Sequence, residues 1–221
     1  MPESDKTSDR IVEAAGEVFA DRGFEQATVR DICQQAGANL AAINYYFGDK
    51  QKLYVEAVKR AHQWKMQQAE MPDWPGDTSP DEMLAGFILT MVRRMKLGDR
   101  DKWQNRLMLR EMMRSNGACA ELVKDSIRPQ FDILTTILRQ LLPESCAEER
   151  LHLTAFSIVG QCLFYHIADP VIRKLVDEDE YDSQSSEKIA EHITRFTLAS
   201  LRADSSAATT SCRTNSKSRK G

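Results

Sequence analysis

The chain has 221 residues, of which 42% are hydrophobic and 29% are charged, and its formal net charge is −3. This is enough apolar material for one large domain or for a small and a medium one. The net charge argues against nonspecific coating of nucleic acid, although a DNA-binding protein needs positive charge only at its contact face. The odd number of cysteines, with no CxxC pair, excludes a secreted disulfide framework.

No apolar run approaches the length that spans a bilayer. The polar start, MPESDKTSDR, lacks the apolar stretch of a signal peptide. We therefore expect a cytoplasmic protein with no membrane partner.

The first expected helix covers residues 8–23, with its apolar side chains at helical spacing. From 24 to 54 the sequence predicts two short helices joined by a turn at Gly37, and then the start of another helix. Thr28 suits the N-cap of the first short helix and Asn39 that of the second. This arrangement is a helix-turn-helix, in which the second helix enters the DNA major groove.

The second short helix is expected to turn Leu40, Ile43 and Phe47 inward, because successive residues rotate by about 100°. Its outer side then carries alanines that let the helix sit deep in the groove and tyrosines that can reach phosphates, with Asn44 at the boundary. Asn39, at the start of the helix, can pair with adenine. Each residue alone fits a solvated helix face, but together they predict DNA contact. The predicted DNA-binding residues are Thr28, Arg30, Asn39, Leu40, Ala41, Ala42, Asn44, Tyr45, Tyr46 and Lys50.

This stretch resembles the N-terminal DNA-binding domain of TetR-family transcriptional regulators over roughly residues 8 to 56. One position departs from the family, which usually has Tyr where this chain has Asn44. The later segments 106–114 and 160–172 resemble a proteobacterial subfamily with a CecR-like C-terminal domain. The residues that carry the family resemblance are Phe19, Gly23, Phe24, Thr28, Ile32, Ala36, Gly37, Tyr45, Phe47, Lys50 and Leu53.

The resemblance implies phosphate contacts for Thr28, Tyr45 and Lys50. Elementary electrostatics agrees for Thr28 and Lys50, because both lie near helix N-termini, where backbone N–H groups favour anions.

The rest of the chain predicts further helices, with no strand pattern and no internal repeat. A long helix from about Asp49 to Met71 would link two domains, and a loop rich in Pro, Gly and Asp follows it. Pro129 should kink or interrupt the helix in which it lies. The remaining expected helices cover about 80–97, 102–115, 118–142, 147–168 and 186–201, with breaks at GDRD (98–101), SNGA (115–118) and Asp169-Pro170.

We therefore predict an all-α fold with three parts. Residues 8–55 form a three-helix helix-turn-helix domain, and residues 56–202 form a helical bundle for regulation and dimerisation. Residues 203–221 form a disordered tail, because this Ser/Thr-rich stretch lacks the large apolar side chains needed to order it. The tail is basic, so a weak auxiliary contact with DNA is the alternative.

The C-terminal part has no catalytic motif, and its histidines are scattered, so we predict no enzyme activity, cofactor or metal. Methionine and aromatic side chains recur there at helical spacing, which is typical of a core and also of an adaptable pocket. The resemblance favours an effector pocket within the bundle. The predicted ligand-binding residues are Phe87, Met91, Trp103, Arg106, Leu107, Arg110, Phe131, Gln161 and Tyr165.

The resemblance also implies that helices 147–168 and 186–201 form a four-helix dimer interface across a two-fold axis, where Ala155 and Gly160 would allow close approach. The alternative is that both helices pack within one subunit. The sequence therefore predicts a ligand-responsive repressor that binds a palindromic DNA operator as a homodimer and is released by a small apolar or amphipathic effector. The alternatives are a helical-bundle enzyme or carrier with an incidental helix-turn-helix, an activator, and a regulator without an effector.

Overall fold

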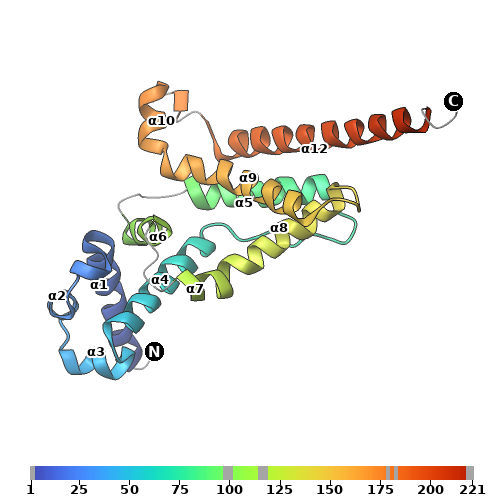
Figure 1. Ribbon diagram of the computed structural model, residues 1–221. Coiled ribbons are helices and arrows are strands. Elements are labelled where there is room, and N and C mark those ends of the chain that lie inside the picture. The colour runs from blue at the N-terminus through green and yellow to red at the C-terminus, as the bar shows by residue number, and fades with distance from the viewer. Residues whose placement is uncertain (1–2, 97–101, 114–118, 178–179, 182–183, 218–221) are drawn as a thin grey trace. The chain divides into compact units, whose positions relative to one another are not determined.

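The computed structural model describes residues 3–96, 102–113, 119–177, 180–181 and 184–217 (Figure 1). All regular elements in these ranges are helices and none is a strand, which confirms the predicted all-α fold. The expected breaks at 98–101 and 115–118, and the last four residues of the expected tail, lie outside the described residues.

Two compact units make up the chain. The N-terminal unit comprises Met1–Ala69 and Gly98–Pro129, and the C-terminal unit comprises Glu70–Leu97 and Gln130–Gly221. This division differs from the predicted boundary at residues 55 and 56, because further helices pack with the helix-turn-helix. The predicted domain bounds stay predictions.

The N-terminal unit is built on α1, which contacts α2, α4 and α6. Its helices are α1 (Glu3–Gln26), α2 (Val29–Ala36), α3 (Leu40–Phe47), α4 (Lys50–Gln67), α6 (Trp103–Met113) and α7 (Cys119–Leu122), followed by the π-helical turn η1 (Val123–Ile127).

Local capping determines where the short helices begin and end. The Thr28 hydroxyl accepts a hydrogen bond from the Asp31 N–H at 3.1 Å, and the Asp31 carboxylate accepts one from the Thr28 N–H at 3.3 Å. Gly37 ends α2 in the left-handed conformation, with φ +56°. Asn39 then caps α3 and Asp49 caps α4. The predicted N-caps at Thr28 and Asn39 and the glycine turn are confirmed.

The core of the N-terminal unit joins the helix-turn-helix to α4 and α6. Phe19 and Tyr54 meet edge to face, with ring centroids 5.0 Å apart, and both are fully buried. The Tyr54 hydroxyl donates to the Glu111 carboxylate of α6 at 2.5 Å in the interior. Leu107 of α6 is also fully buried in this core. Helix α6 is therefore an integral part of the unit that contains the helix-turn-helix.

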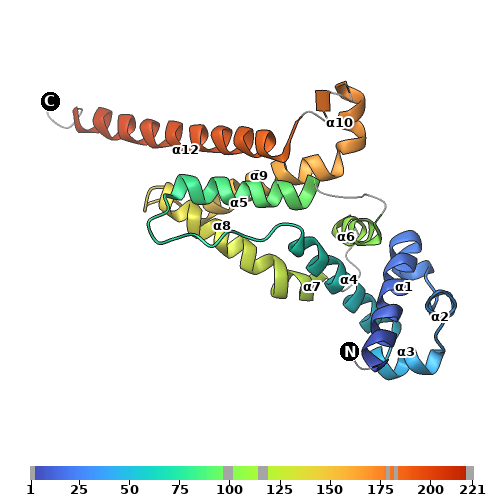
Figure 2. The same ribbon diagram turned by 180° about the vertical axis from the view of Figure 1, so that it is seen from behind.

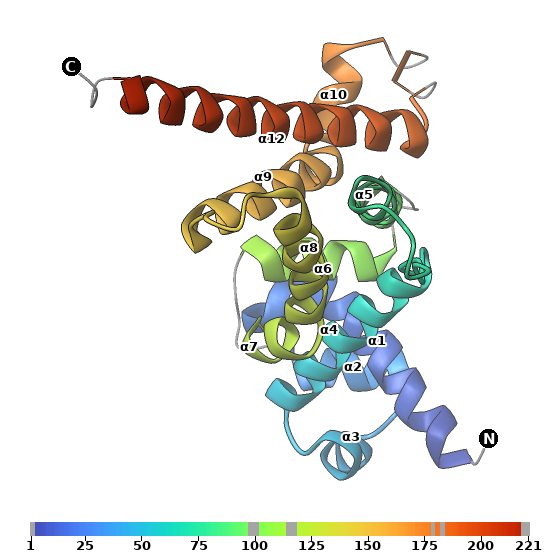
Figure 3. The ribbon, with the colours of Figure 1, turned by 90° about the vertical axis from the view of Figure 1, so that its right-hand side faces the viewer.

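The C-terminal unit has α5 at its centre, in contact with both α9 and α12. Figures 1 and 2 show α12 running alongside α5, and Figure 3 shows it crossing α9. The other helices of this unit are α8, which begins at the border between the units, and the short α10. The bounds are α5 (Pro80–Lys96), α8 (Arg128–Leu141), α9 (Glu148–Ile167), α10 (Asp169–Leu175) and α12 (Ser186–Lys217).

The structure refines several expected helix bounds. Pro129 is the second residue of α8, and the π-helical turn η1 ends just before that helix, at Ile127. The α-helical ladder is thus interrupted next to the proline, as expected, because proline has no N–H to continue it. Asp169-Pro170 ends α9 as expected, but Pro170 also lies in the first turn of α10, a helix that the sequence did not predict. Helix α12 extends to Lys217, so the predicted tail begins inside this helix and its disorder stays a prediction.

Among the described residues no single helix is long and apolar enough to cross a membrane. Helices α9 and α10 reach that length and composition only as a pair bent by 75°.

A close contact between α1 and α6 yields a prediction about stability. A Cβ atom on Gly16 would lie 2.4 Å from the Trp103 ring. We expect Gly16→Ala to lower the free energy of unfolding by about 1–2 kcal/mol, because overpacking outweighs the better helix propensity of alanine. In a Trp103→Ala background the same change should stabilise α1 by up to about 1 kcal/mol. Urea unfolding of the four proteins tests this, and equal effects in both backgrounds would contradict it.

Candidate nucleic-acid interface

The second short helix, α3, is attached by one fully buried side chain, that of Ile43. Tyr45 is 82% exposed, and its ring meets that of Tyr46 edge to face with centroids 5.0 Å apart. Ala41 and Asn44 are exposed, whereas Ala42 and Tyr46 are half-buried. Most of the predicted base-facing side of α3 is therefore open to a large partner.

Leu40 was expected to point inward but is 57% exposed. It is the first residue of α3, nearly one turn before Ile43, and the core begins beneath Ala42 and Ile43. The sequence pattern was correct about helical spacing and wrong about where the core starts. An exposed Leu40 is available for apolar contact with thymine methyl groups, as the predicted DNA-binding set requires.

The N-terminus of α2 holds a small polar network. The Thr28 hydroxyl donates to Asp31 Oδ2 at 2.7 Å, and Arg22 Nη1 lies 2.7 Å from the same oxygen. The hydrogen bond from Thr28 and, to a lesser extent, the charge of Arg22 lower the pKa of the Asp31 carboxyl. The Thr28 hydroxyl proton is thus engaged within the protein, and a phosphate must draw it away from Asp31. The phosphate contact of Thr28 stays a prediction.

Asn39 and Lys50 both occupy helix N-termini. The Asn39 Oδ1 atom accepts from the Ala42 N–H at 2.8 Å, so one side of the amide is used in capping. Lys50 is the first residue of α4, and its ammonium lies 4.4 Å from the centroid of the Phe24 ring. This cation–π contact positions the Lys50 side chain, which we predict to contact a phosphate. The sequence reasoning did not assign this role to Phe24, because the two residues are distant in the sequence.

Four of the nine predicted ligand-binding residues belong to α6 and contact α1. Trp103 Nε1 donates to Glu13 Oε2 at 2.8 Å, and Leu107 is fully buried. Arg106 Nη2 donates to Asp21 Oδ1 at 2.8 Å. The fourth, Arg110, donates to the Asp21 carbonyl at 3.1 Å. The structure thus gives each of these residues a contact within the N-terminal unit.

The other five predicted ligand-binding residues lie in the C-terminal unit. Phe87 and Met91 are buried in its core, and Phe131 stacks on Phe156 with centroids 5.5 Å apart. Gln161 Nε2 donates to a carbonyl of its own helix at 3.3 Å. Tyr165 packs half-buried against the core. Neither unit contains all nine residues, and their role in ligand binding stays a prediction.

The sequence reasoning missed a buried cation in the C-terminal unit. Arg94 is only 5% exposed, and its Nη1 donates to Gln130 Oε1 at 2.8 Å. Burial lowers the pKa of its guanidinium. The adjacent Arg93 is exposed and pairs with Glu187 at 2.8 Å. Two consecutive arginines in a sequence give no sign of which one faces the core.

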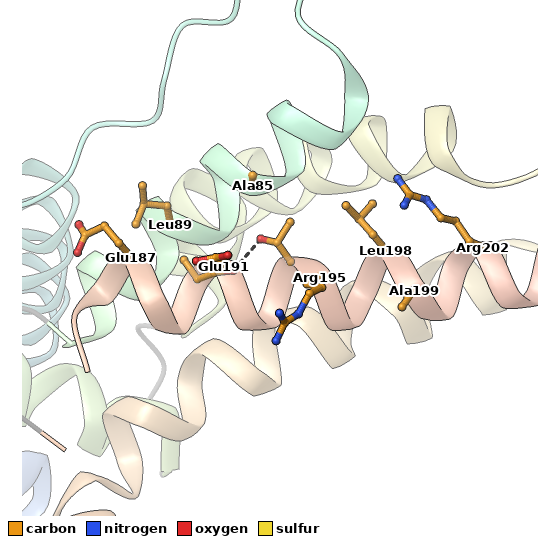
Figure 4. Close-up of a pocket in the computed structure, with 10 residues that line it drawn as sticks. Ala85, Leu89, Glu187, Glu191, Arg195, Leu198, Ala199 and Arg202 are labelled. Atoms are coloured by element: carbon orange, nitrogen blue, oxygen red, sulfur yellow. Dashed lines mark hydrogen bonds between the residues drawn. The ribbon is translucent and has the colours of Figure 1, made fainter. Parts of the chain in front are cut away.

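A groove between α5 and α12 also lies in the C-terminal unit (Figure 4). Its volume is about 460 Å³, and none of the nine predicted ligand-binding residues lines it. Across the described ranges, no group of three or more His, Cys, Asp or Glu side chains is arranged to hold a metal ion. Burial raises the pKa of the Cys162 thiol to about 12, so this cysteine is protonated at neutral pH.

Two family models match the chain. One, described as bacterial regulatory proteins of the tetR family, matches residues 11–57. The other, described as the C-terminal domain of the HTH-type transcriptional dual regulator CecR, matches residues 80–203, which is more than half of the chain. The chain therefore belongs to the TetR family of bacterial transcription regulators. Its C-terminal domain is of the CecR type.

Individual relatives agree with this assignment. The HTH-type transcriptional dual regulator CecR of Shigella flexneri is 26% identical over 84% of this chain and 86% of its own length. The HTH-type transcriptional repressor NicS of Pseudomonas putida is 35% identical over 60 residues, which are 27% of this chain and 28% of NicS. These names favour a regulator over a helical-bundle enzyme or carrier.

Solved structures show the same fold. A TetR-like regulator from Rhodococcus sp. RHA1 superimposes with a TM-score of 0.63 at 19% identity, over 91% of this chain and 98% of that protein. FadR from Bacillus subtilis, solved in complex with stearoyl-CoA, gives a TM-score of 0.60 at 19% identity, over 86% of this chain and 97% of FadR.

The placement of Lys50 yields a second prediction. Lys50→Ala should weaken binding to every DNA sequence and reduce the slope of log affinity against log salt by roughly one unit, because one phosphate contact is lost. Titration of labelled duplexes at several salt concentrations measures this. Lys174→Ala, an exposed lysine of α10, is the control. An unchanged slope for Lys50→Ala would show that this lysine does not contact a phosphate.

The two uses of Asn39 can be separated. Asn39→Ser keeps an N-cap and removes the amide, so the stability of the protein should change little. If Asn39 reads adenine, discrimination at one base pair per half-site should fall by about 1–3 kcal/mol. Selection from a randomised operator library measures this preference. A profile identical to that of the wild type would mean that Asn39 serves only as a helix cap.

Proposed function

We propose that this protein is a cytoplasmic repressor that binds a palindromic operator as a homodimer and is released by a small apolar or amphipathic effector. The observation that carries the proposal is the exposed face of α3 in a TetR-type helix-turn-helix, with Tyr45 open to solvent and Lys50 held beside it at the start of α4. A two-fold axis would present two such helices to successive major grooves. Genome-wide mapping of bound DNA tests the proposal, which requires palindromic sites.

An apolar surface on α9 and α12 supports the homodimer. Leu153, Phe156 and Phe164 of α9 are 59%, 60% and 54% exposed, and Phe196 of α12 is 60% exposed. Exposed apolar patches of this kind mark surfaces for partners. A Cβ atom on Gly160, in the same helix, would meet nothing within 4 Å. This position therefore has room for another helix.

The other small residue expected at this interface, Ala155, is fully buried and packs into the core of its own unit. Of the two, Gly160 is the one available to a second subunit.

The effector is best sought in the core of the C-terminal unit. Adaptable side chains such as Met91 and Phe131 lie there together with the buried Arg94 and its half-buried partner Gln130. An apolar body with one polar or anionic end would match this combination. FadR, which shares the fold, was solved with stearoyl-CoA, a ligand of that general kind. We extend only the chemical class to this chain.

Helix α6 offers a route from the effector to DNA. It follows α5 in the chain, yet it packs into the core of the N-terminal unit. Arg110 reaches the end of α1, where its guanidinium lies beside Gly23, and Gly23 has φ +75° at a kink in the helix. A displaced α6 would shift α1 and with it the helix-turn-helix. Only an effector with different affinities for the two states can cause such a displacement.

If this route is correct, effector binding and its coupling to DNA binding should respond differently to two substitutions. The effector should weaken operator binding by roughly 5- to 150-fold, and operator DNA should weaken effector binding by the same factor. Phe131→Ala should weaken effector binding, because it removes part of the core of the C-terminal unit. Trp103→Ala should leave effector binding nearly unchanged and reduce the coupling, because Trp103 contacts α1.

A thermal-shift screen measures effector binding, and DNA titration at saturating ligand measures its coupling to operator binding. If the screen finds ligands that stabilise the protein but none that changes operator affinity, the effector part of the proposal is wrong. Loss of ligand binding in Trp103→Ala would place the ligand against α6 and contradict the proposed separation of roles.

A further inference from the structure

An arginine outside the predicted DNA-binding set lies directly beside that set. Arg22, near the end of α1, places its Nη1 atom 2.7 Å from Asp31 Oδ2. The same oxygen accepts the proton of the Thr28 hydroxyl at 2.7 Å. One carboxylate oxygen thus joins α1 to the N-cap of α2. The guanidinium of Arg22 therefore lies at the N-terminus of α2, where we expect Thr28 to contact a phosphate.

Most of the hydrogen-bonding capacity of Arg22 is unused. A guanidinium has five N–H donors in a planar fork. Within the described ranges, Asp31 is the one residue with which Arg22 forms an ion pair or hydrogen bond. The Arg22 side chain is 53% exposed, so its other donors are accessible to a partner. Arginine is well suited to hold a carboxylate and a phosphate, because its fork matches the geometry of both groups.

The acidic group of this network would otherwise oppose DNA binding. The hydrogen bond from Thr28 and, to a lesser extent, the charge of Arg22 lower the pKa of Asp31, so its carboxyl is ionised at neutral pH. Asp31 lies in the first turn of α2, next to the expected phosphate, and like charges repel. Arg22 is the cation in contact with this carboxylate and offsets the repulsion.

We propose that Arg22 is a further DNA-contacting residue, whose guanidinium bridges the Asp31 carboxylate and a phosphate of the DNA backbone at the N-terminus of α2. One part of the fork holds the carboxylate, and the free donors bind a phosphate oxygen. Asp31 then keeps a partner when the Thr28 hydroxyl turns from it towards the phosphate. Because the contact is to the backbone, it adds affinity for every sequence and carries no base preference.

The inference rests on DNA binding by the helix-turn-helix in the proposed function, and it adds a residue from α1 to that interface. The competing role for Arg22 is structural, in which it only restrains Asp31 as part of the α2 cap. The two roles differ once the carboxylate is removed. A phosphate contact of Arg22 persists without the negative charge of Asp31, whereas a restraint on Asp31 then has no effect on DNA.

A double-mutant series separates the two roles. The probes are a labelled duplex that the wild-type protein selects from a random library and an unrelated duplex of the same length, each titrated at several salt concentrations. Arg22→Ala should weaken binding to both duplexes roughly tenfold at low salt, because a charge-assisted hydrogen bond is lost. It should also reduce the slope of log affinity against log salt by about one unit.

Asp31→Asn supplies the background that decides between the roles. Asparagine keeps an oxygen that accepts from the Thr28 N–H, so the cap should persist and both duplexes should bind at least as well as to the wild type. In this background Arg22→Ala should again reduce the salt slope by about one unit. Urea unfolding checks that each variant is folded.

Arg139→Ala is the matched control. Arg139 is also 53% exposed and pairs with Glu148 at 2.9 Å, but it lies in the C-terminal unit, so its loss should leave the salt slope unchanged. If Arg22→Ala has no effect on the slope in the Asp31→Asn background, the phosphate bridge is wrong while DNA binding by the helix-turn-helix stands. A wild-type chain that selects no duplex would overturn the proposed function itself.

Discussion

The stability of this helix-turn-helix is limited by the short length of its two helices. Helices α2 and α3 have eight residues each, well below the length at which an isolated helix is stable in water. They persist because Thr28 and Asn39 cap them and because each buries an isoleucine, Ile32 or Ile43, in a shared core. The face offered to DNA is therefore only as well ordered as the helices behind it, α1, α4 and α6.

Features that depend on neighbours in the sequence were predictable. The caps, the glycine turn at Gly37 and the interruption at Pro129 each follow from the chemistry of one or two residues, and the structure confirms them. The helical content and the family follow from spacing and from motifs spread along the chain. These signals do not depend on how distant segments pack.

Features that depend on distant segments were not predictable. Trp103 and Leu107 are side chains of the types that line pockets, and nothing in their own segment indicates that they pack on α1. Leu40 fits the inward stripe of α3, but the core ends before reaching it. The burial of Arg94 beside the exposed Arg93 is likewise decided by the helices around α5. Periodicity locates a face, and only tertiary packing determines what covers it.

The membership of α6 in the N-terminal unit limits how this regulator could exchange parts with its relatives during evolution. A recombination event that transferred residues 11–57 alone would leave behind Leu107 and Met108, which complete the core, and the partner of the buried Tyr54 hydroxyl. The transplanted helix-turn-helix would expose an apolar face and lose stability. The N-terminal unit is thus discontinuous in the sequence, and α6 must co-evolve with α1 even though segments of the C-terminal unit flank it in the chain.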